Sequence, residues 1–157
     1  MNSMNKKLKI LLLILAAIFI VIQIIPFRKP SNKPVFGNDL MEASAIPQDI
    51  ASLLKNTCYD CHSQHARFPW YAHVAPVSWL VARDVNVGRE HLDFDKWGSL
   101  TKKEKLKFLD EISEEVDSEN MPMKIYTIMH GDARISRAQR DMIVQWAEKM
   151  AEQVFEE

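Results

Sequence analysis

Residues 56–63 read NTCYDCHS, and the five residues from Cys58 to His62 form the pattern C-x-x-C-H. The ten residues before Cys58, QDIASLLKNT at 48–57, repeat their apolar side chains at helical spacing. The pattern predicts a short helix that leads directly into the first cysteine. Both cysteines of the chain therefore belong to one local motif.

C-x-x-C-H is the pattern of covalent haem attachment. Two cysteines three residues apart lie on one side of a helical turn, so each thiol can form a thioether with one vinyl group of the macrocycle. The imidazole that follows can bind the iron as the proximal ligand. We therefore predict haem c as the cofactor, held by Cys58, Cys61 and His62.

The same residues allow other interpretations. A thioredoxin-like redox pair needs its C-x-x-C beside a βαβ pattern, which this chain does not have. A structural zinc site needs four ligands, so a histidine from elsewhere would have to complete it. The available histidines are His65, His73 and His130. A chance occurrence of the pattern is the third alternative.

The ligand on the other face of the iron is predicted from a later segment. Met121 precedes Pro122 in an irregular stretch between two helical patterns. A thioether sulfur at this place gives His/Met coordination, which raises the reduction potential and suits electron transfer. We predict Met121 as the distal ligand, with Met123 as the alternative. The remaining candidates are an open site or one of Met129, His65, His73 and His130.

Aromatic residues are expected to pack around the macrocycle and keep water from the iron. They are Trp70, Tyr71, Trp79, Trp97 and Trp146. Arg67 and Arg83 are candidates for pairing with the haem propionates.

The amino terminus contains a long apolar stretch. Residues 10–25 are apolar except for Gln23, three lysines precede them, and no small-x-small cleavage site follows. Counted from Leu8 to Ile25, a helix is about 27 Å long, near the lower limit for a bilayer core of about 30 Å. We predict a single transmembrane helix in the cytoplasmic membrane, with the domain on the periplasmic, extracytoplasmic side.

The rest of the chain divides into a linker and a domain. Residues 26–45 contain three prolines and several polar residues, which is typical of an extended tether. The predicted organisation is a membrane anchor at 1–25, a linker at 26–45 and a haem-binding domain at 46–157.

Three further helices are predicted in this domain. One begins at Pro76 and extends to about Val85. The other two, 101–116 and 136–155, each begin with a capping box, Thr101 with Glu104 and Ser136 with Gln139. Because no strand-like alternation of useful length intervenes, the fold class is predicted to be all-α.

Length, charge and cysteine content exclude several classes of protein. A chain of 157 residues has room for one small domain, which excludes a multidomain enzyme. Its 20 basic and 21 acidic residues give a net charge of −1, so there is no basic excess to bind nucleic acid. Two cysteines are too few for a disulfide scaffold.

The sequence also resembles a bacterial family of small membrane-tethered proteins that is named for its haem-binding domain and includes monohaem relatives of cytochrome c. The resemblance rests on the amino-terminal segment, NTCYDCHS, FPWYAHVAPVSWLV at 68–81, DVNVGREHLDF at 84–94, and a late Met-Pro followed by H-x-x-A-x-x-S at 130–136. It implies a small cytochrome c-like helical domain around one haem. It further implies Cys58 and Cys61 as thioether sites, His62 as proximal ligand and Met121 as distal ligand.

These observations predict a membrane-tethered one-electron carrier rather than an enzyme. Its expected partners are the membrane and an unidentified redox protein. A haem peroxidase is the enzymatic alternative, with His65 or His73 and Arg67 as acid/base groups. A haem or gas-sensing module is the third possibility.

Overall fold

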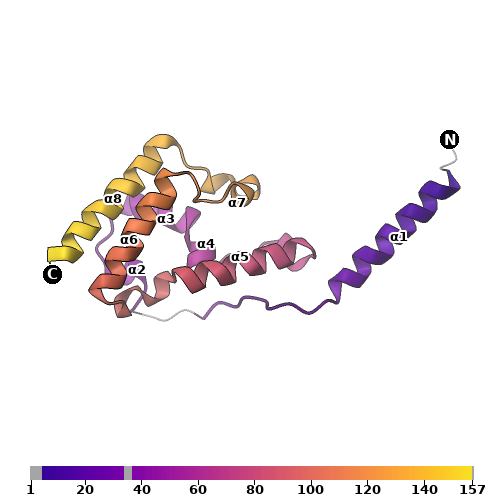
Figure 1. The fold of residues 1–157 in the computed structure, drawn as a ribbon, viewed down its shortest axis with the longest axis horizontal. Coiled ribbons are helices and arrows are strands. Elements are labelled where there is room, and N and C mark those ends of the chain that lie inside the picture. Colours follow the sequence, from indigo (N-terminus) through magenta and orange to yellow (C-terminus); the bar gives the residue numbers. More distant parts are fainter. Residues whose placement is uncertain (1–4, 34–36, 157) are drawn as a thin grey trace. The chain divides into compact units, whose positions relative to one another are not determined.

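The computed structural model describes residues 5–33 and 37–156 of the chain. These residues form helices and no strands, as expected of an all-α protein. Figure 1 shows them in the order α1 (Lys6–Gln23), α2 (Leu40–Ala43), α3 (Gln48–Thr57), α4 (Tyr59–His62), the 3₁₀ helix η1 (Trp70–His73), α5 (Val77–His91), η2 (Phe94–Ser99), α6 (Lys102–Asp117), α7 (Lys124–Met129), η3 (Gly131–Ala133) and α8 (Arg137–Glu156).

The predicted membrane span is wrong. No helix in the described part of the chain is both long and apolar enough to cross a membrane. Helix α1 has 18 residues, but it begins at Lys6 and includes three lysines in its first turns. Only about 14 residues follow them, about 21 Å of helix against a bilayer core of about 30 Å. This finding contradicts the prediction of a transmembrane helix. It also contradicts the two predictions that depended on it: the membrane as partner, and a single-pass location with a periplasmic domain.

The chain divides into two compact units, of which the first contains residues up to Pro30 together with Arg67–Asn86. Within this unit, Gln23 joins the end of α1 to a distant loop. Its Nε2 donates to the Ala75 carbonyl at 3.1 Å, and its Oε1 accepts from the Ala75 N–H at 2.9 Å. The one polar residue of the apolar stretch is therefore held to Ala75 by two backbone hydrogen bonds.

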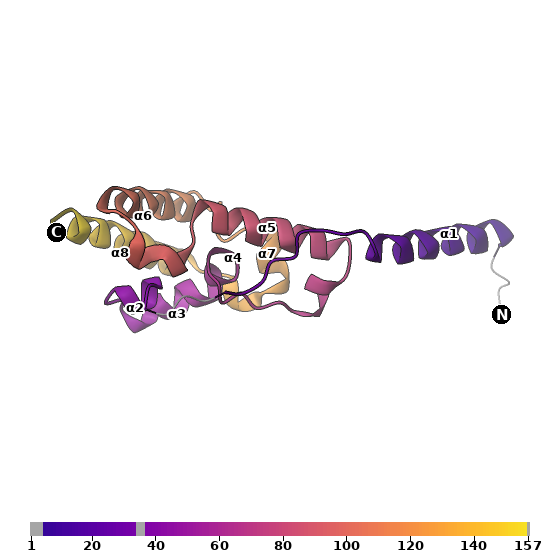
Figure 2. The same cartoon turned by 90° about the horizontal axis from the view of Figure 1, so that it is seen from below.

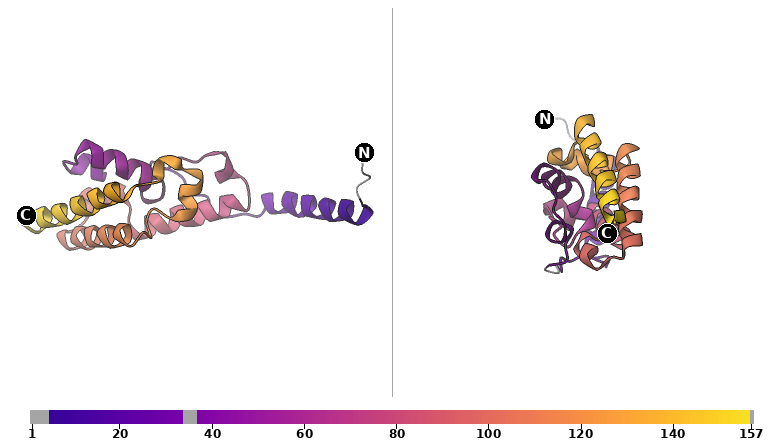
Figure 3. Two further views of the ribbon diagram at one scale, coloured as in Figure 1. Left: turned by 90° about the horizontal axis from the view of Figure 1, so that it is seen from above. Right: turned by 90° about the vertical axis from the view of Figure 1, so that its left-hand side faces the viewer.

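The second unit contains Ser31–Ala66 and Val87–Glu157. Its largest feature is the pair α6 and α8, which lie side by side and run in opposite directions (Figures 1 and 2). Helix α3 packs against α8 in the same unit (Figure 3). Leu54 of α3, Leu109 of α6 and Ile143 of α8 are at most 1% exposed, so these three helices share one core.

The two predicted capping boxes are confirmed. The Thr101 hydroxyl accepts from the Glu104 N–H, and the Glu104 carboxylate accepts from the Thr101 N–H. Ser136 and Gln139 make the same reciprocal pair at 2.8 and 3.2 Å. These bonds satisfy amide groups that a helix start otherwise leaves without partners, which is why α6 and α8 begin where the sequence predicts.

The short elements α2 and η2 complete this core. They contact each other, and they bury Leu40, Phe94 and Trp97 almost completely. Tyr59, inside the C-x-x-C-H motif, stacks on Phe94 with ring centroids 5.1 Å apart. The motif is therefore attached to the core through one of its two variable residues.

Candidate functional site

The C-x-x-C-H motif folds as a single turn. Cys58 ends α3 and begins α4, so it is the cap of both helices. Its carbonyl accepts from the N–H of Cys61 at 3.1 Å and from the N–H of His62 at 2.9 Å. Both cysteines and the histidine thus belong to one hydrogen-bonded unit that continues from α3.

His62 is held in a defined orientation by a backbone group. Its Nδ1 lies 3.0 Å from the carbonyl oxygen of Leu92. Because a carbonyl can only accept, Nδ1 carries the proton and Nε2 keeps its lone pair. Burial lowers the pKa of His62, which favours the neutral ring. A neutral imidazole anchored through its other nitrogen is the form in which histidine binds metals.

This carbonyl belongs to the residue after α5, and α5 packs its backbone closely against the motif. A Cβ added at Gly88 would lie 2.6 Å from the carbonyl oxygen of Cys61. One residue later, Arg89 Nε donates to the carbonyl of Ser63 at 2.8 Å. The absence of a side chain at Gly88 therefore permits the approach that brings Leu92 to His62.

The environment of Cys58 disfavours the redox-dithiol interpretation. The thiol packs against the hydrophobic core, and the Thr57 hydroxyl lies 3.1 Å from its sulfur. Burial raises the pKa of Cys58 to about 11. The attacking cysteine of a redox C-x-x-C has a lowered pKa, because the thiolate is the nucleophile.

The zinc interpretation finds no support in the described residues. Among residues 5–33 and 37–156, no cluster of three or more His, Cys, Asp or Glu ligand atoms includes Cys58 or Cys61. Of the three histidines considered, His65 pairs with Asp95, His73 with Lys29, and His130 stacks on Tyr126. Each of them thus has a partner other than a cysteine.

The segment that carries Met121 and Met123 follows α6. The N–H of Met121 donates to the carbonyl of Glu115 at 2.9 Å, and Met123 is the cap of α7. Met121 packs against the same core as Cys58. Both methionines are partly buried.

Helix α7 is joined to the motif by a side-chain hydrogen bond. Tyr126 Oη donates to Asp60 Oδ2 at 2.7 Å, and Asp60 is the second variable residue of C-x-x-C-H. Tyr126 also stacks on His130, with ring centroids 4.0 Å apart. Because Met121 and Met123 directly precede α7, the hydrogen bond from Tyr126 connects their segment to the C-x-x-C-H turn. The assignment of the distal ligand stays a prediction.

Several contacts of this site involve residues that the sequence did not single out. They are Gly88, Leu92 and Tyr126 with its partner Asp60. For Gly88 a signal exists, because a glycine inside a helical pattern often marks a close backbone approach. For Leu92 no sequence pattern could predict the contact with His62, because the contact is made by the backbone carbonyl and not by the side chain.

Other residues expected around the cofactor lie in different places. Trp97 and Trp146 are part of the core of the second unit. The first unit contains Arg67, Trp70, Tyr71, Trp79 and Arg83. Trp70 is 73% exposed. A role for these residues around a haem stays a prediction.

Comparison with known proteins gives one match. Residues 17–149 match the family model described as a haem-binding domain. No curated protein and no solved structure matches the chain. The matched range includes the whole C-x-x-C-H turn, the carbonyl that orients His62 and the methionine segment, so the resemblance seen in the sequence is confirmed.

Proposed function

Because this chain belongs to the haem-binding domain family and is a haem-binding protein, we propose that it is a c-type haem protein that carries one electron at a time. Cys58 and Cys61 would hold the macrocycle through thioethers, and His62 Nε2 would bind the iron. The observation that supports this assignment most directly is the 3.0 Å contact between His62 Nδ1 and the Leu92 carbonyl. It leaves the other nitrogen as the electron-pair donor.

The chemistry of the donor set fits a haem. Two thiols and one neutral imidazole lie on a single turn beside an apolar core, as two thioethers and one iron ligand require. The haem supplies the redox-active iron. The residues around it hold and orient it, and Met121 is the proposed second ligand, with Met123 as the alternative.

The peroxidase alternative requires acid/base groups that the carrier function does not. A peroxidase needs an open iron position and a side chain that moves a proton there. His65 Nε2 lies 3.4 Å from Asp95, and His73 Nδ1 lies 3.1 Å from Lys29 Nζ. An electron carrier needs only a haem that is shielded from water and whose iron has two protein ligands.

Attachment can be tested by producing the full chain together with a haem-attachment system. We expect a c-type pyridine haemochrome spectrum and a mass increase of one haem. The double variant Cys58→Ser with Cys61→Ser should lose both. Colourless protein with two titratable thiols from the same host would refute covalent binding.

The distal ligand and the carrier role can be tested on the haem-loaded protein. We expect low-spin iron in both oxidation states, reversible one-electron reduction and the far-red absorption band of a methionine-to-ferric-iron bond. Met121→Ala should abolish that band and lower the reduction potential, whereas Met123→Ala should retain both. The reverse result would assign Met123, and high-spin iron in both states would contradict the carrier function.

A further inference from the structure

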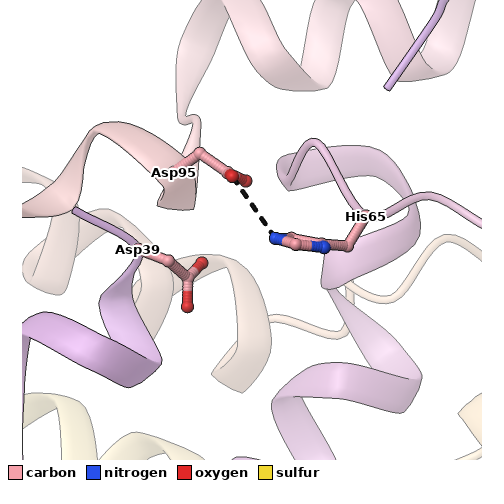
Figure 4. A group of neighbouring side chains, drawn as sticks. All are labelled: Asp39, His65 and Asp95. Atoms are coloured by element: carbon pink, nitrogen blue, oxygen red, sulfur yellow. Dashed lines mark ion pairs between the residues drawn. The ribbon is translucent and has the colours of Figure 1, made fainter. Parts of the chain in front are cut away.

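Asp39, His65 and Asp95 form a second group of possible ligands, separate from the C-x-x-C-H cysteines and histidine. One ligand atom from each residue lies within 4.8 Å of the others. Figure 4 shows the three side chains converging from the cap of α2, the loop after α4 and η2. The two carboxylates are 5% and 1% exposed, while the His65 side chain is 50% exposed. We propose that this group binds a divalent transition-metal ion of the zinc class.

The spacing of one pair of ligand atoms fits a shared ion. His65 Nε2 and Asp95 Oδ1 lie 3.4 Å apart. This distance is longer than the roughly 2.7–2.9 Å of a charge-assisted hydrogen bond. It is close to the roughly 3.3 Å that separates two ligand atoms of a tetrahedral zinc ion with bonds of about 2.0–2.1 Å.

Both carboxylates are already oriented by neutral donors. Asp39 Oδ1 accepts from the Met41 N–H at 2.8 Å, and the Tyr59 hydroxyl lies 3.1 Å from both Asp39 oxygens. Asp95 Oδ2 accepts from the Gln64 N–H at 2.6 Å. Ligand carboxylates of metal sites are typically hydrogen-bonded in this way by outer residues.

Burial makes a positive ion favourable at this place. Two ionised carboxylates that lie close together and are shielded from water repel each other. A divalent cation between them removes that repulsion. His65 lies at the exposed side of the group, with half of its side-chain surface open to solvent.

The donor atoms select the class of metal. Calcium takes six to eight oxygen ligands, and magnesium prefers oxygen ligands in octahedral geometry. Here an imidazole nitrogen joins two carboxylates, a set that suits zinc and related transition metals with water in the remaining position. The ion would tie the start of α2 to η2, and through Tyr59 to the C-x-x-C-H turn.

The proposal is independent of the haem assignment and is tested by titrating the purified full chain with zinc chloride after chelator treatment. We expect one zinc ion per chain at this site and a rise in the thermal unfolding midpoint. His65→Ala and Asp95→Asn should each weaken zinc binding at least tenfold and abolish that rise. His73→Ala, which removes an exposed histidine of the first unit, should behave like the wild type.

The variants also separate this site from zinc bound by thiols. All of them keep Cys58 and Cys61, so binding by cysteine would survive the substitutions. Because His65 is half exposed, His65→Ala is expected to fold even if Asp95→Asn does not. Zinc affinity that is unchanged in His65→Ala would overturn the proposal, as would calcium or magnesium binding as tightly as zinc.

Discussion

Gly88 is the residue at which α5 comes closest to the C-x-x-C-H turn. A methyl group there would lie 2.6 Å from the Cys61 carbonyl oxygen and 3.2 Å from its carbonyl carbon. Both atoms are backbone, so they cannot move aside as a flexible side chain would. We expect Gly88→Ala to lower the free energy of unfolding by about 1–3 kcal/mol, as overpacking does. Urea denaturation measures this change.

Gly131 is the matched control, because a Cβ there meets nothing within 4 Å. Gly131→Ala should therefore leave stability nearly unchanged. Equal effects of the two substitutions would show that the contact between Gly88 and Cys61 does not limit the packing.

The Cys58 thiol is expected to react slowly in the haem-free protein. With its pKa raised to about 11, far less thiolate is present at pH 8 than in an unfolded chain. In the variant Cys61→Ser, alkylation by iodoacetamide should be at least tenfold slower in the folded than in the urea-unfolded protein. The folded rate should keep rising with pH up to about pH 10, and a plateau near pH 9 would contradict the shift.

At the scale of elements, Tyr126 joins α7 to the motif through a side-chain hydrogen bond. Tyr126→Phe removes the 2.7 Å hydrogen bond to Asp60 but keeps the ring that stacks on His130. Hydrogen bonds to charged groups contribute about 1.5–3 kcal/mol, so we expect a loss of stability of that size. If Met121 is the distal ligand, its far-red band should also weaken. Thr127→Val, which alters only a local bond to Lys124, is the control.

Element starts could be predicted where the signal is local. The capping residues Thr101 and Ser136 bond to groups three residues away, so sequence spacing alone reveals them. The end of α5 was misplaced, because the apolar pattern weakens near Val85 while the helix extends to His91. The last turns of α5 are supported by the close approach of Gly88 to Cys61. The local sequence pattern does not indicate this contact, because the two residues are far apart in the sequence.

The candidate site shows the same division between local and distant contacts. The arrangement of the cysteines and His62 on one turn was predictable, because the motif is continuous in sequence. The Leu92 carbonyl and the bond between Tyr126 and Asp60 were not, since they join residues 30 and 66 positions apart. The prediction of a membrane span failed for a different reason: the helix begins at Lys6, which places three lysines within it.

For the whole molecule, the shared core of α3, α6 and α8 is expected to determine stability. Leu109 is 1% exposed and belongs to that core. We expect Leu109→Ala to lower the free energy of unfolding by about 2–5 kcal/mol, the usual cost of a core cavity. Chemical denaturation followed by circular dichroism measures it, with the exposed Lys103→Ala as control. A loss below about 1 kcal/mol would show that stability resides elsewhere.

The order of the contacts along the chain has a consequence for biosynthesis. The groups that enclose the C-x-x-C-H turn, from Gly88 and Leu92 to Tyr126, all follow it and leave the ribosome later. During that interval these contacts with the turn have not yet formed. If a haem is attached to these cysteines as proposed, its attachment would be easiest before those later residues have folded against the turn.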